Sequence, residues 1–273
     1  AVAQLTAPGQ MFEINDVEIN GYRYRNYAGL PKNLNGYYQF MLMHAEKEFA
    51  EYNDERYTFA QGLQYGVEFA AALVDRYGIE KGDRVAILSR NNPQWMMAFI
   101  GITSIGAVAV PMNSWWTTEE LDYGFEDSGA KVVVADCARA KRLAPFAAKR
   151  GLSIVSVDDC TDLEVPHTPF MSLLEDYQGA SLPAVEVVAD DNATIMYTSG
   201  TTGHPKGALS SHRGILAALF SWMLMGMASK SLEDPATEEK DRFPPAGLLT
   251  VPLFHCTGSH SAFLLSMIVG RKL

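Results

Sequence analysis

One stretch in the second half of the chain combines residue types that bind phosphate. It runs from residue 197 to residue 207 and reads Tyr-Thr-Ser-Gly-Thr-Thr-Gly-His-Pro-Lys-Gly. Glycines allow successive backbone N–H groups to point at one anion, and hydroxyl side chains add further donors. Lys206 supplies a positive charge for the terminal phosphate oxygens of a nucleotide, and the hydroxyl of Thr201 or Thr202 suits a magnesium ion. The residues expected to contact phosphate are Thr198, Ser199, Gly200, Thr201, Thr202, Gly203 and Lys206.

Two other interpretations of this stretch fit less well. A Walker A loop needs Gly-Lys-Ser/Thr, whereas here Pro205 precedes Lys206 and Gly207 follows it. A glycine- and threonine-rich surface turn is the ordinary outcome for a short motif match, but the length of this string favours a phosphate loop. An apolar, β-prone segment precedes the loop, and a helical pattern begins near Ile215. The loop is therefore expected between a buried strand and a helix, where phosphate loops usually sit.

The segments before this loop alternate between strand and helix patterns. Two helix starts carry capping residues, namely Thr58 with Gln61 and Asn92 with Pro93, and residues 117–120 open another helix that ends near Gly129. Strands are expected at residues 84–88, 107–110, 132–135, 153–157 and 247–251, an edge strand at 22–27, and helices at 35–52, 138–149 and 259–268. This alternation predicts an α/β fold in which parallel sheets are covered by helices on both faces.

Shifts in composition divide the chain into three expected parts. Residues 1–56 form an N-terminal lead-in, residues 57–180 a first α/β subdomain, and residues 181–273 the beginning of a second one that carries the phosphate loop. The boundary is placed in residues 158–189, which form a looser, proline-containing connection. Residues 229–245 are charged and end in two prolines, so an exposed excursion is expected there.

Charge and cysteine content exclude several classes of protein. The net charge of −10 argues against a nucleic-acid surface. The three cysteines, Cys137, Cys160 and Cys256, lie far apart without a Cys-x-x-Cys pattern, which argues against a disulfide scaffold or zinc knuckle and fits a reducing cytosol. Cys256 is interpreted as a buried thiol beside the pocket histidine His255 rather than as a nucleophile. No signal peptide or transmembrane segment is expected, because the uncharged run 95–112 is broken by glycine and proline. A cytoplasmic location follows.

The eleven residues of the loop resemble the phosphate-binding signature of the adenylate-forming superfamily, which includes acyl-CoA synthetases, peptide-synthetase adenylation domains and luciferases. The family pattern is aromatic-Thr-Ser-Gly-Ser/Thr-Thr-Gly-x-Pro-Lys-Gly, and every position fits it. A second match is Pro-Leu-Phe-His at residues 252–255, similar to the family's motif beside the acyl pocket. Residues 82–87 and 106–111 also look like family segments, so the resemblance runs from about Tyr57 to the last residue.

The resemblance implies an enzyme that activates a carboxylic acid. In this family the acid attacks the α-phosphorus of ATP, magnesium pyrophosphate leaves, and the acyl group passes to coenzyme A. By matching position, residues 198–203 and Lys206 would hold the β- and γ-phosphates, with Thr202 facing Mg²⁺. His255 would lie at the mouth of the acyl pocket, so Lys206, Thr202 and His255 are the expected catalytic residues. With Trp115 and Trp116 after Pro111 and the overall spacing, the sequence most resembles ligases of fatty acids and related carboxylates; aryl and other medium-sized acids are the alternative substrates.

Several family segments have no counterpart in this sequence. These are the Tyr-Gly-x-Thr-Glu and Thr-Gly-Asp segments, the hinge, and the small C-terminal domain with its catalytic lysine. The chain is therefore interpreted as the incomplete N-terminal domain of such an enzyme, inactive when isolated. A non-catalytic relative that binds phosphate or a partner is one alternative. An unrelated phosphotransferase is another, but it would need an acidic strand end near the loop, which the sequence does not offer. The oligomeric state is left open, and a homodimer is compatible with the sequence.

Overall fold

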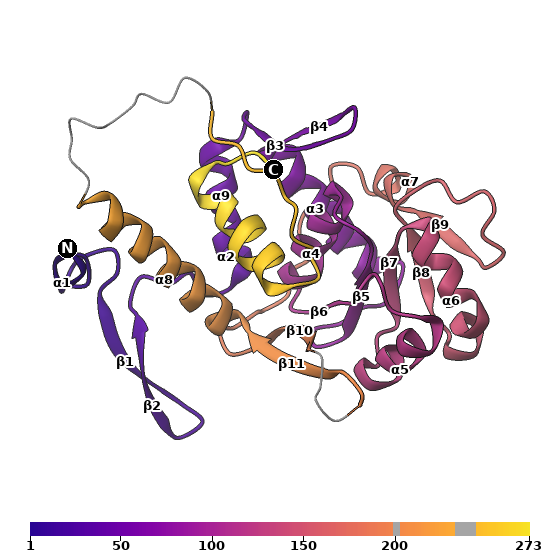
Figure 1. Cartoon of the computed structure of the whole chain (residues 1–273), viewed down its shortest axis with the longest axis horizontal. Helices are drawn as coiled ribbons and strands as arrows, with labels where there is room; N and C mark the ends of the chain where they lie inside the picture. The colour runs from indigo at the N-terminus through magenta and orange to yellow at the C-terminus, as the bar shows by residue number, and fades with distance from the viewer. Residues whose placement is uncertain (199–202, 233–243) are drawn as a thin grey trace.

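A seven-stranded sheet forms the centre of the molecule in the computed structural model, which describes residues 1–198, 203–232 and 244–273. The strand order is β11-β10-β6-β5-β7-β8-β9, and every neighbouring pair is parallel except β10 and β11 (Figure 1). The strands are β5 Arg84–Leu88, β6 Val108–Pro111, β7 Val132–Ala135, β8 Ser153–Ser156, β9 His167–Pro169, β10 Asn192–Thr198 and β11 Lys206–Ser211. The predicted α/β fold is confirmed.

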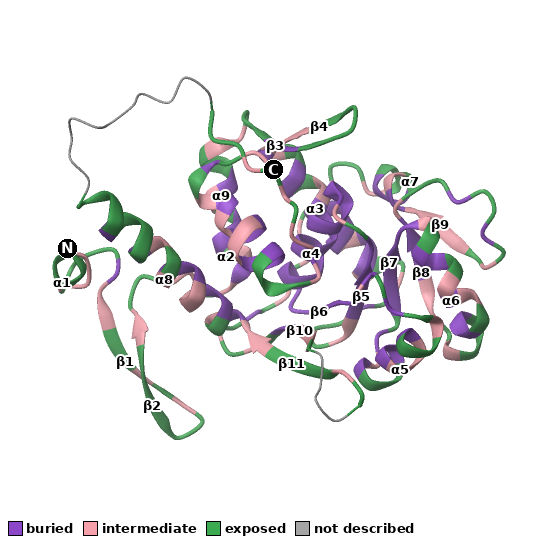
Figure 2. Cartoon of the chain, viewed as in Figure 1, coloured by how far each residue is buried: buried purple, intermediate pink, exposed green. Residues whose placement is uncertain are grey.

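Helices cover both faces of this sheet, as the strand patterns predicted. On one face lie α3 Phe59–Asp75 and α4 Pro93–Ser104, and on the other lie α5 Thr118–Ser128 and α6 Cys137–Arg150. Strand β5 contributes to two separate cores, because Val85 and Ile87 pack with α3 and α4 while Ala86 and Leu88 pack with α5 and α6. Figure 2 shows the central strands as buried. None of the helices in the described ranges has the length and apolar character that crossing a bilayer demands.

The helix starts predicted at Thr58, Asn92 and residues 117–120 are confirmed. Thr58 forms a reciprocal capping box with Gln61 at the start of α3, and Thr117 does the same with Glu120 at the start of α5. The side chain of Asn92 accepts a hydrogen bond from the backbone N–H of Trp95, with proline at the first position of α4. These local bonds satisfy N–H groups that the helix itself cannot pair.

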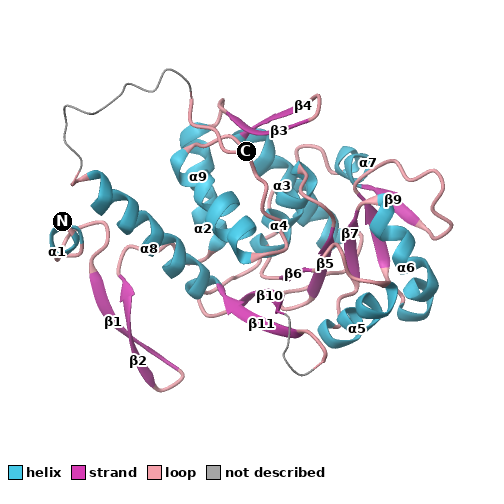
Figure 3. Cartoon of the chain, in the orientation of Figure 1, coloured by secondary structure: helices cyan, strands magenta, loops and turns pink. Residues whose placement is uncertain are grey.

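The remaining elements lie around the sheet (Figure 3). They are α1 Val2–Leu5, β1 Ile14–Ile19, β2 Tyr22–Tyr27, α2 Leu34–Tyr38, the 3-10 helix η1 Gln39–His44, β3 Glu48–Tyr52, β4 Glu55–Thr58, α7 Phe170–Asp176, α8 His212–Lys230, the π-helix η3 Thr257–Leu264 and α9 Leu265–Val269. Strand β2 pairs only with β1, which confirms the strand expected at 22–27. The excursion expected at 229–245 lies mostly outside the described residues.

Three local predictions are wrong. The helix expected at 35–52 ends early, because residues from Glu48 onward form β3, which pairs with β4. The strand expected at 247–251 does not form: the side chain of Asn91 donates to the carbonyl oxygens of Leu249 and Val251 and so replaces a strand partner. The phosphate loop is not followed directly by a helix, since β11 lies between the loop and α8.

Strands β10 and β11 extend the same sheet that the middle of the chain builds. Thr194 of β10 lies opposite Ala109 of β6 in a parallel pairing. The loop therefore belongs to this sheet and not to the second sheet that the sequence predicted. The division into residues 1–56, 57–180 and 181–273 remains a prediction.

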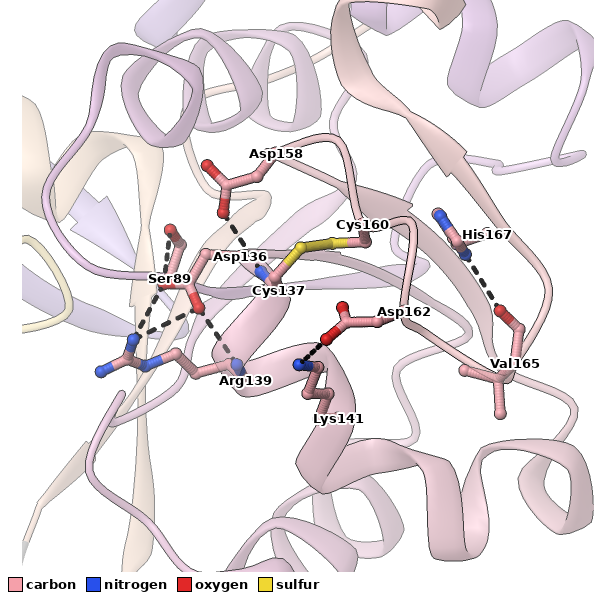
Figure 4. The surroundings of a disulfide bond; sticks show 10 residues. All are labelled: Ser89, Asp136, Cys137, Arg139, Lys141, Asp158, Cys160, Asp162, Val165 and His167. Carbon is pink, nitrogen blue, oxygen red and sulfur yellow. Dashed lines mark hydrogen bonds and ion pairs between the residues drawn. A yellow bond between two sulfur atoms is a disulfide. The ribbon is translucent and has the colours of Figure 1, made fainter.

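The cysteine prediction is also wrong. Cys137 and Cys160 form a disulfide with their Cα atoms 5.5 Å apart (Figure 4). Cys137 follows β7 and Cys160 follows β8, and these strands are parallel neighbours. Their carboxyl ends therefore meet at one sheet edge, and this juxtaposition depends on strand order, which sequence spacing does not reveal.

Two buried histidines make stability depend on pH. Burial lowers the pKa of His212 and of His260 to about 4. A histidine in an unfolded chain titrates near about 6.5, so between these values the unfolded state binds more protons. Their contribution is complete above pH about 6.5 and is lost as the pH falls toward about 4, by at most about 3 kcal/mol for each histidine. Urea unfolding across this pH range should show that the free energy of unfolding falls as the pH falls. His212→Asn should make this dependence on pH weaker. Equal slopes for both proteins would contradict the assignment.

Candidate functional site

A cavity of about 610 Å³ brings the two predicted motifs together. Thr198, Gly203 and Pro205 line one part of it, and Phe254 and His255 line another. The cavity lies at the carboxyl ends of β10 and β6, the edge of an open α/β sheet where ligands bind. Ser199, Gly200, Thr201 and Thr202 lie outside the described residues, and so do their expected phosphate contacts and the expected Mg²⁺ contact of Thr202.

Helix α5 holds both ends of the phosphate loop. On the far end, the Tyr123 hydroxyl donates to the carbonyl oxygen of Pro205 at 3.2 Å, and its ring stacks on His204 with 4.6 Å between centroids. On the near end, the Tyr197 hydroxyl donates to a carboxylate oxygen of Asp127 at 2.6 Å. Burial, and then the Asp127 carboxylate, raise the pKa of Tyr197, so its hydroxyl keeps the proton it donates. Tyr123 and Asp127 could not be predicted from the sequence, because no local pattern links α5 to the loop.

Lys206 is placed as a free charge beside this cavity. It is the first residue of β11, lies opposite Thr198 and is exposed. Within the described residues no carboxylate pairs with its ammonium group. It does not line the cavity, unlike Thr198 and Gly203. The next residue must be small, because a Cβ added to Gly207 would lie 2.7 Å from Cγ2 of Ile195.

His255 lines the cavity, and one of its ring nitrogens accepts a hydrogen bond from the neighbouring backbone. Its Nδ1 accepts the backbone N–H of Thr257 at 3.2 Å, so the neutral ring carries its proton on Nε2. The residue is exposed and lines the cavity, which leaves Nε2–H available as a donor. Cys256 was predicted to be buried, but it is exposed. Its Sγ lies 3.9 Å from the same Nδ1. Because Nδ1 already accepts from Thr257, it is poorly placed to act as a base for this thiol.

The backbone of the Pro-Leu-Phe-His segment is fixed from two sides. The N–H of His255 donates to the carbonyl oxygen of Pro252 at 3.0 Å. Gly258 packs so closely that an added Cβ would lie 2.2 Å from that same oxygen. The Asn91 side chain makes three further hydrogen bonds to this part of the chain. It donates to the carbonyl oxygens of Leu249 and Val251 and accepts the N–H of Leu253 at 2.8 Å. This support positions His255 by contacts distant in sequence.

Removing the Asn91 side chain should loosen this segment. Asn91→Ala leaves partly buried carbonyl and N–H groups of residues 249–253 without partners, so we expect a loss of about 2–3 kcal/mol in the free energy of unfolding. Urea unfolding measures it. Gln178→Ala, at an exposed position, is the matched control and should stay within about 0.5 kcal/mol of the native value. Equal stability of the two variants would contradict the bracing role.

A polar network holds the wall on the other side of the cavity. Asn113 and Trp116 line that wall, and the ring of Trp116 meets Tyr197 edge to face at 5.3 Å. Arg139 of α6 donates to the carbonyl oxygen of Ser114 at 3.1 Å, and Arg142 donates to that of Trp116 at 2.9 Å. Both arginines thus tie the loop after β6 to helix α6.

The fold and the site together define an α/β protein with a cavity at the carboxyl ends of parallel strands, walled by a glycine-rich hairpin loop and a histidine segment. The family model of the AMP-binding enzymes matches residues 39–273, and the chain belongs to this family. The predicted family resemblance is therefore confirmed.

Curated relatives are CoA ligases of fatty and aromatic acids. The chain is 35% identical over 204 residues to the long-chain-fatty-acid–CoA ligase FadD13 of Mycobacterium tuberculosis, covering 74% of this chain and 36% of that protein. It is 33% identical over 220 residues to 4-coumarate–CoA ligase 3 of Oryza sativa subsp. japonica, covering 80% and 37%. The chain thus spans little more than a third of the length of these relatives.

Solved structures agree on the fold. The inhibitor-bound N-terminal domain of FACL13 from Mycobacterium tuberculosis matches with a TM-score of 0.70 and 29% identity, over 89% of this chain and 57% of that one. The anthranilate CoA ligase AuaEII matches with a TM-score of 0.75 at 22% identity, over 89% and 44%, which supports the fold alone.

Proposed function

We propose that this chain is the N-terminal part of an ATP-dependent carboxylate–CoA ligase. The observation that carries the proposal is the single cavity lined both by Thr198 and Gly203 of the loop and by His255. The printed names of its relatives, a long-chain-fatty-acid–CoA ligase and a 4-coumarate–CoA ligase, support this reaction type. Substrates in this proposal are a carboxylic acid, ATP and coenzyme A.

The chemistry needs charge neutralisation first. When pyrophosphate leaves ATP, negative charge builds on its oxygens, and fixed donors that meet this charge lower the barrier. In the proposal, residues 198–203 and the Lys206 ammonium supply those donors. The Nε2–H of His255 donates to the acid's carboxylate and orients it toward the α-phosphorus. The role of His255 is supported by its place at the cavity, and the roles of residues 199–202 rest on the sequence motif.

Magnesium fits this arrangement as an ion held mainly by the substrate. Mg²⁺ usually binds through substrate phosphates with only one or two protein oxygens. Over the described ranges there is no cluster of three or more histidine, cysteine or acidic side chains that would form a cage. We assign the hydroxyl of Thr202 as the protein contribution, and the ion would supply positive charge to the leaving pyrophosphate.

A fatty acid is the acyl substrate we favour, because Trp116 is a buried aromatic wall of the cavity and the fatty-acid ligase named above is the more identical of the two relatives. An aromatic acid is the competing choice. We also keep the cytoplasm as the location and leave a homodimer open, although the Cys137–Cys160 disulfide removes cysteine content as an argument for the cytoplasm.

ATP–pyrophosphate exchange tests the proposal. We expect exchange, driven best by fatty acids, in a polypeptide that continues beyond Leu273 into the remaining two thirds of the relatives' length, and none above background in this chain alone. Graded straight-chain acids and 4-coumarate should be compared as drivers. Robust exchange by the isolated chain would overturn the fragment interpretation. No exchange by the longer polypeptide with any acid would favour a non-catalytic phosphate-binding relative.

A further inference from the structure

The disulfide between Cys137 and Cys160 is unequally exposed. Cys160 is only 1% exposed, whereas Cys137 is half-buried at the first position of α6 (Figure 4). A thiolate from solution therefore has one accessible sulfur to attack, that of Cys137.

The bond joins α6 covalently to a segment that also packs into the same core as this helix. Cys137 begins α6, and Cys160 lies in the connection after β8. Beside the bond, the Cys137 N–H donates to Asp158 at 3.2 Å and Lys141 pairs with Asp162, both at exposed positions, while Leu163 is buried in the same core as α6. Exposed ion pairs contribute little stability, so the disulfide and this apolar packing are what hold the connection to α6.

The start of α6 is also connected by hydrogen bonds to the loop that lines the candidate site. Asp136, next to Cys137, is buried and accepts the backbone N–H of Arg90 at 3.0 Å. The same carboxylate pairs with Arg139, whose Nε holds the carbonyl of Ser114. Any loosening of the first turn of α6 therefore reaches the loop that contributes Asn113 and Trp116 to the cavity.

We propose that Cys137 and Cys160 form a thiol–disulfide exchange site for low-molecular-weight thiols such as glutathione, and that its oxidation state sets how firmly α6 holds the Ser114–Trp116 wall. In the reducing direction a thiolate attacks Sγ of Cys137, the protein S–S bond breaks, and Cys160 leaves and takes up a proton. A second thiolate attacks the mixed disulfide and releases Cys137. One protein disulfide becomes two thiols, and two small thiols become one small disulfide.

Thiol counting on the whole chain tests the exchange. After incubation with glutathione disulfide, alkylation in denaturant should leave Cys137 and Cys160 unmodified, and after an excess of reduced glutathione it should modify all three cysteines, Cys256 included. Mass spectrometry identifies the modified residues. Cys256→Ser is the matched control, because it should leave the pairing intact. Three alkylated cysteines after oxidation, or only one after incubation with reduced glutathione, would overturn the proposal.

Two further measurements distinguish a disulfide that affects stability and the Ser114–Trp116 wall from one that affects neither. Reduction of the native protein should lower its melting temperature by roughly 5–10 °C, and should leave that of the Cys137→Ser, Cys160→Ser double variant unchanged. Amide hydrogen exchange of residues 113–117 should be faster in the reduced protein. An unchanged melting temperature would overturn the stabilising role, and unchanged exchange at 113–117 would overturn the coupling to the wall.

Discussion

Lys206→Ala is expected to slow acid-dependent ATP–pyrophosphate exchange by about 10²–10³-fold in the longer, active polypeptide. The ammonium group is exposed beside the loop, and within the described part of the chain no acidic side chain neutralises it. A charge that meets the leaving pyrophosphate acts in the transition state, so the loss should appear in kcat. The free energy of unfolding should change by less than about 0.5 kcal/mol, because the side chain packs against little.

The matched control for this variant is Lys149→Ala. Lys149 is an exposed lysine in the last turn of α6, far along the chain from the loop. Its replacement alters net charge equally and should leave exchange within about twofold of the native rate. Lys206→Arg should recover part of the activity, since it keeps the charge but changes the geometry. If Lys206→Ala lowered stability and left the exchange rate intact, the phosphate assignment would be wrong.

Gly258→Ala is expected to have the largest effect on stability of any single methyl group added near the site. The new Cβ would lie 2.2 Å from the carbonyl oxygen of Pro252, a backbone atom that cannot rotate away. The turn that carries His255 must therefore open, and we expect a loss of about 3 kcal/mol in the free energy of unfolding. Exchange activity should fall with it, because His255 loses its hydrogen bond to the Pro252 carbonyl.

Gly226→Ala provides a control of opposite sign. Gly226 lies in α8, and a Cβ added there meets nothing within 4 Å. Alanine in a helix costs less conformational entropy than glycine, so this variant should gain about 0.5–1 kcal/mol. Urea unfolding of both proteins gives the comparison. A Gly258→Ala protein as stable as the native one would show that the turn accommodates the methyl group.

Local signals predicted the central fold because the residues that begin a helix also accept hydrogen bonds from the N–H groups of its first turn. Thr58, Asn92 and Thr117 cap their own helices through bonds that span three residues. Four-residue apolar strands such as β7 are buried on both faces, so any parallel sheet would accept them. These features need no knowledge of distant partners.

The predictions that are wrong depend on partners far along the chain. Strand β3 is held in part by the chain end, because the N–H of Glu51 donates to the carbonyl of Leu273 and the N–H of Leu273 donates to that of Phe49. Residues 247–251 are bound by the Asn91 side chain instead of a strand. The cysteines pair because two strands are neighbours.

The candidate site could be predicted only in part for the same reason. The loop and the histidine segment were visible as motifs, and the structure places Thr198, Gly203 and His255 around one cavity. The side chains that support them, Tyr123 and Asp127 from α5, carry no local signal because their partners lie about 70 to 80 residues away. The roles of residues 199–202 remain predictions.

Amide hydrogen exchange of this chain with millimolar MgATP tests the shared cavity most directly. ATP should slow exchange in peptides covering residues 194–207, and adding a fatty acid should extend protection to residues 252–259, because both stretches line the same cavity. Lys206→Ala should reduce the ATP effect. Protection confined to other parts of the chain, or none at all, would contradict the placement of a nucleotide between the loop and His255.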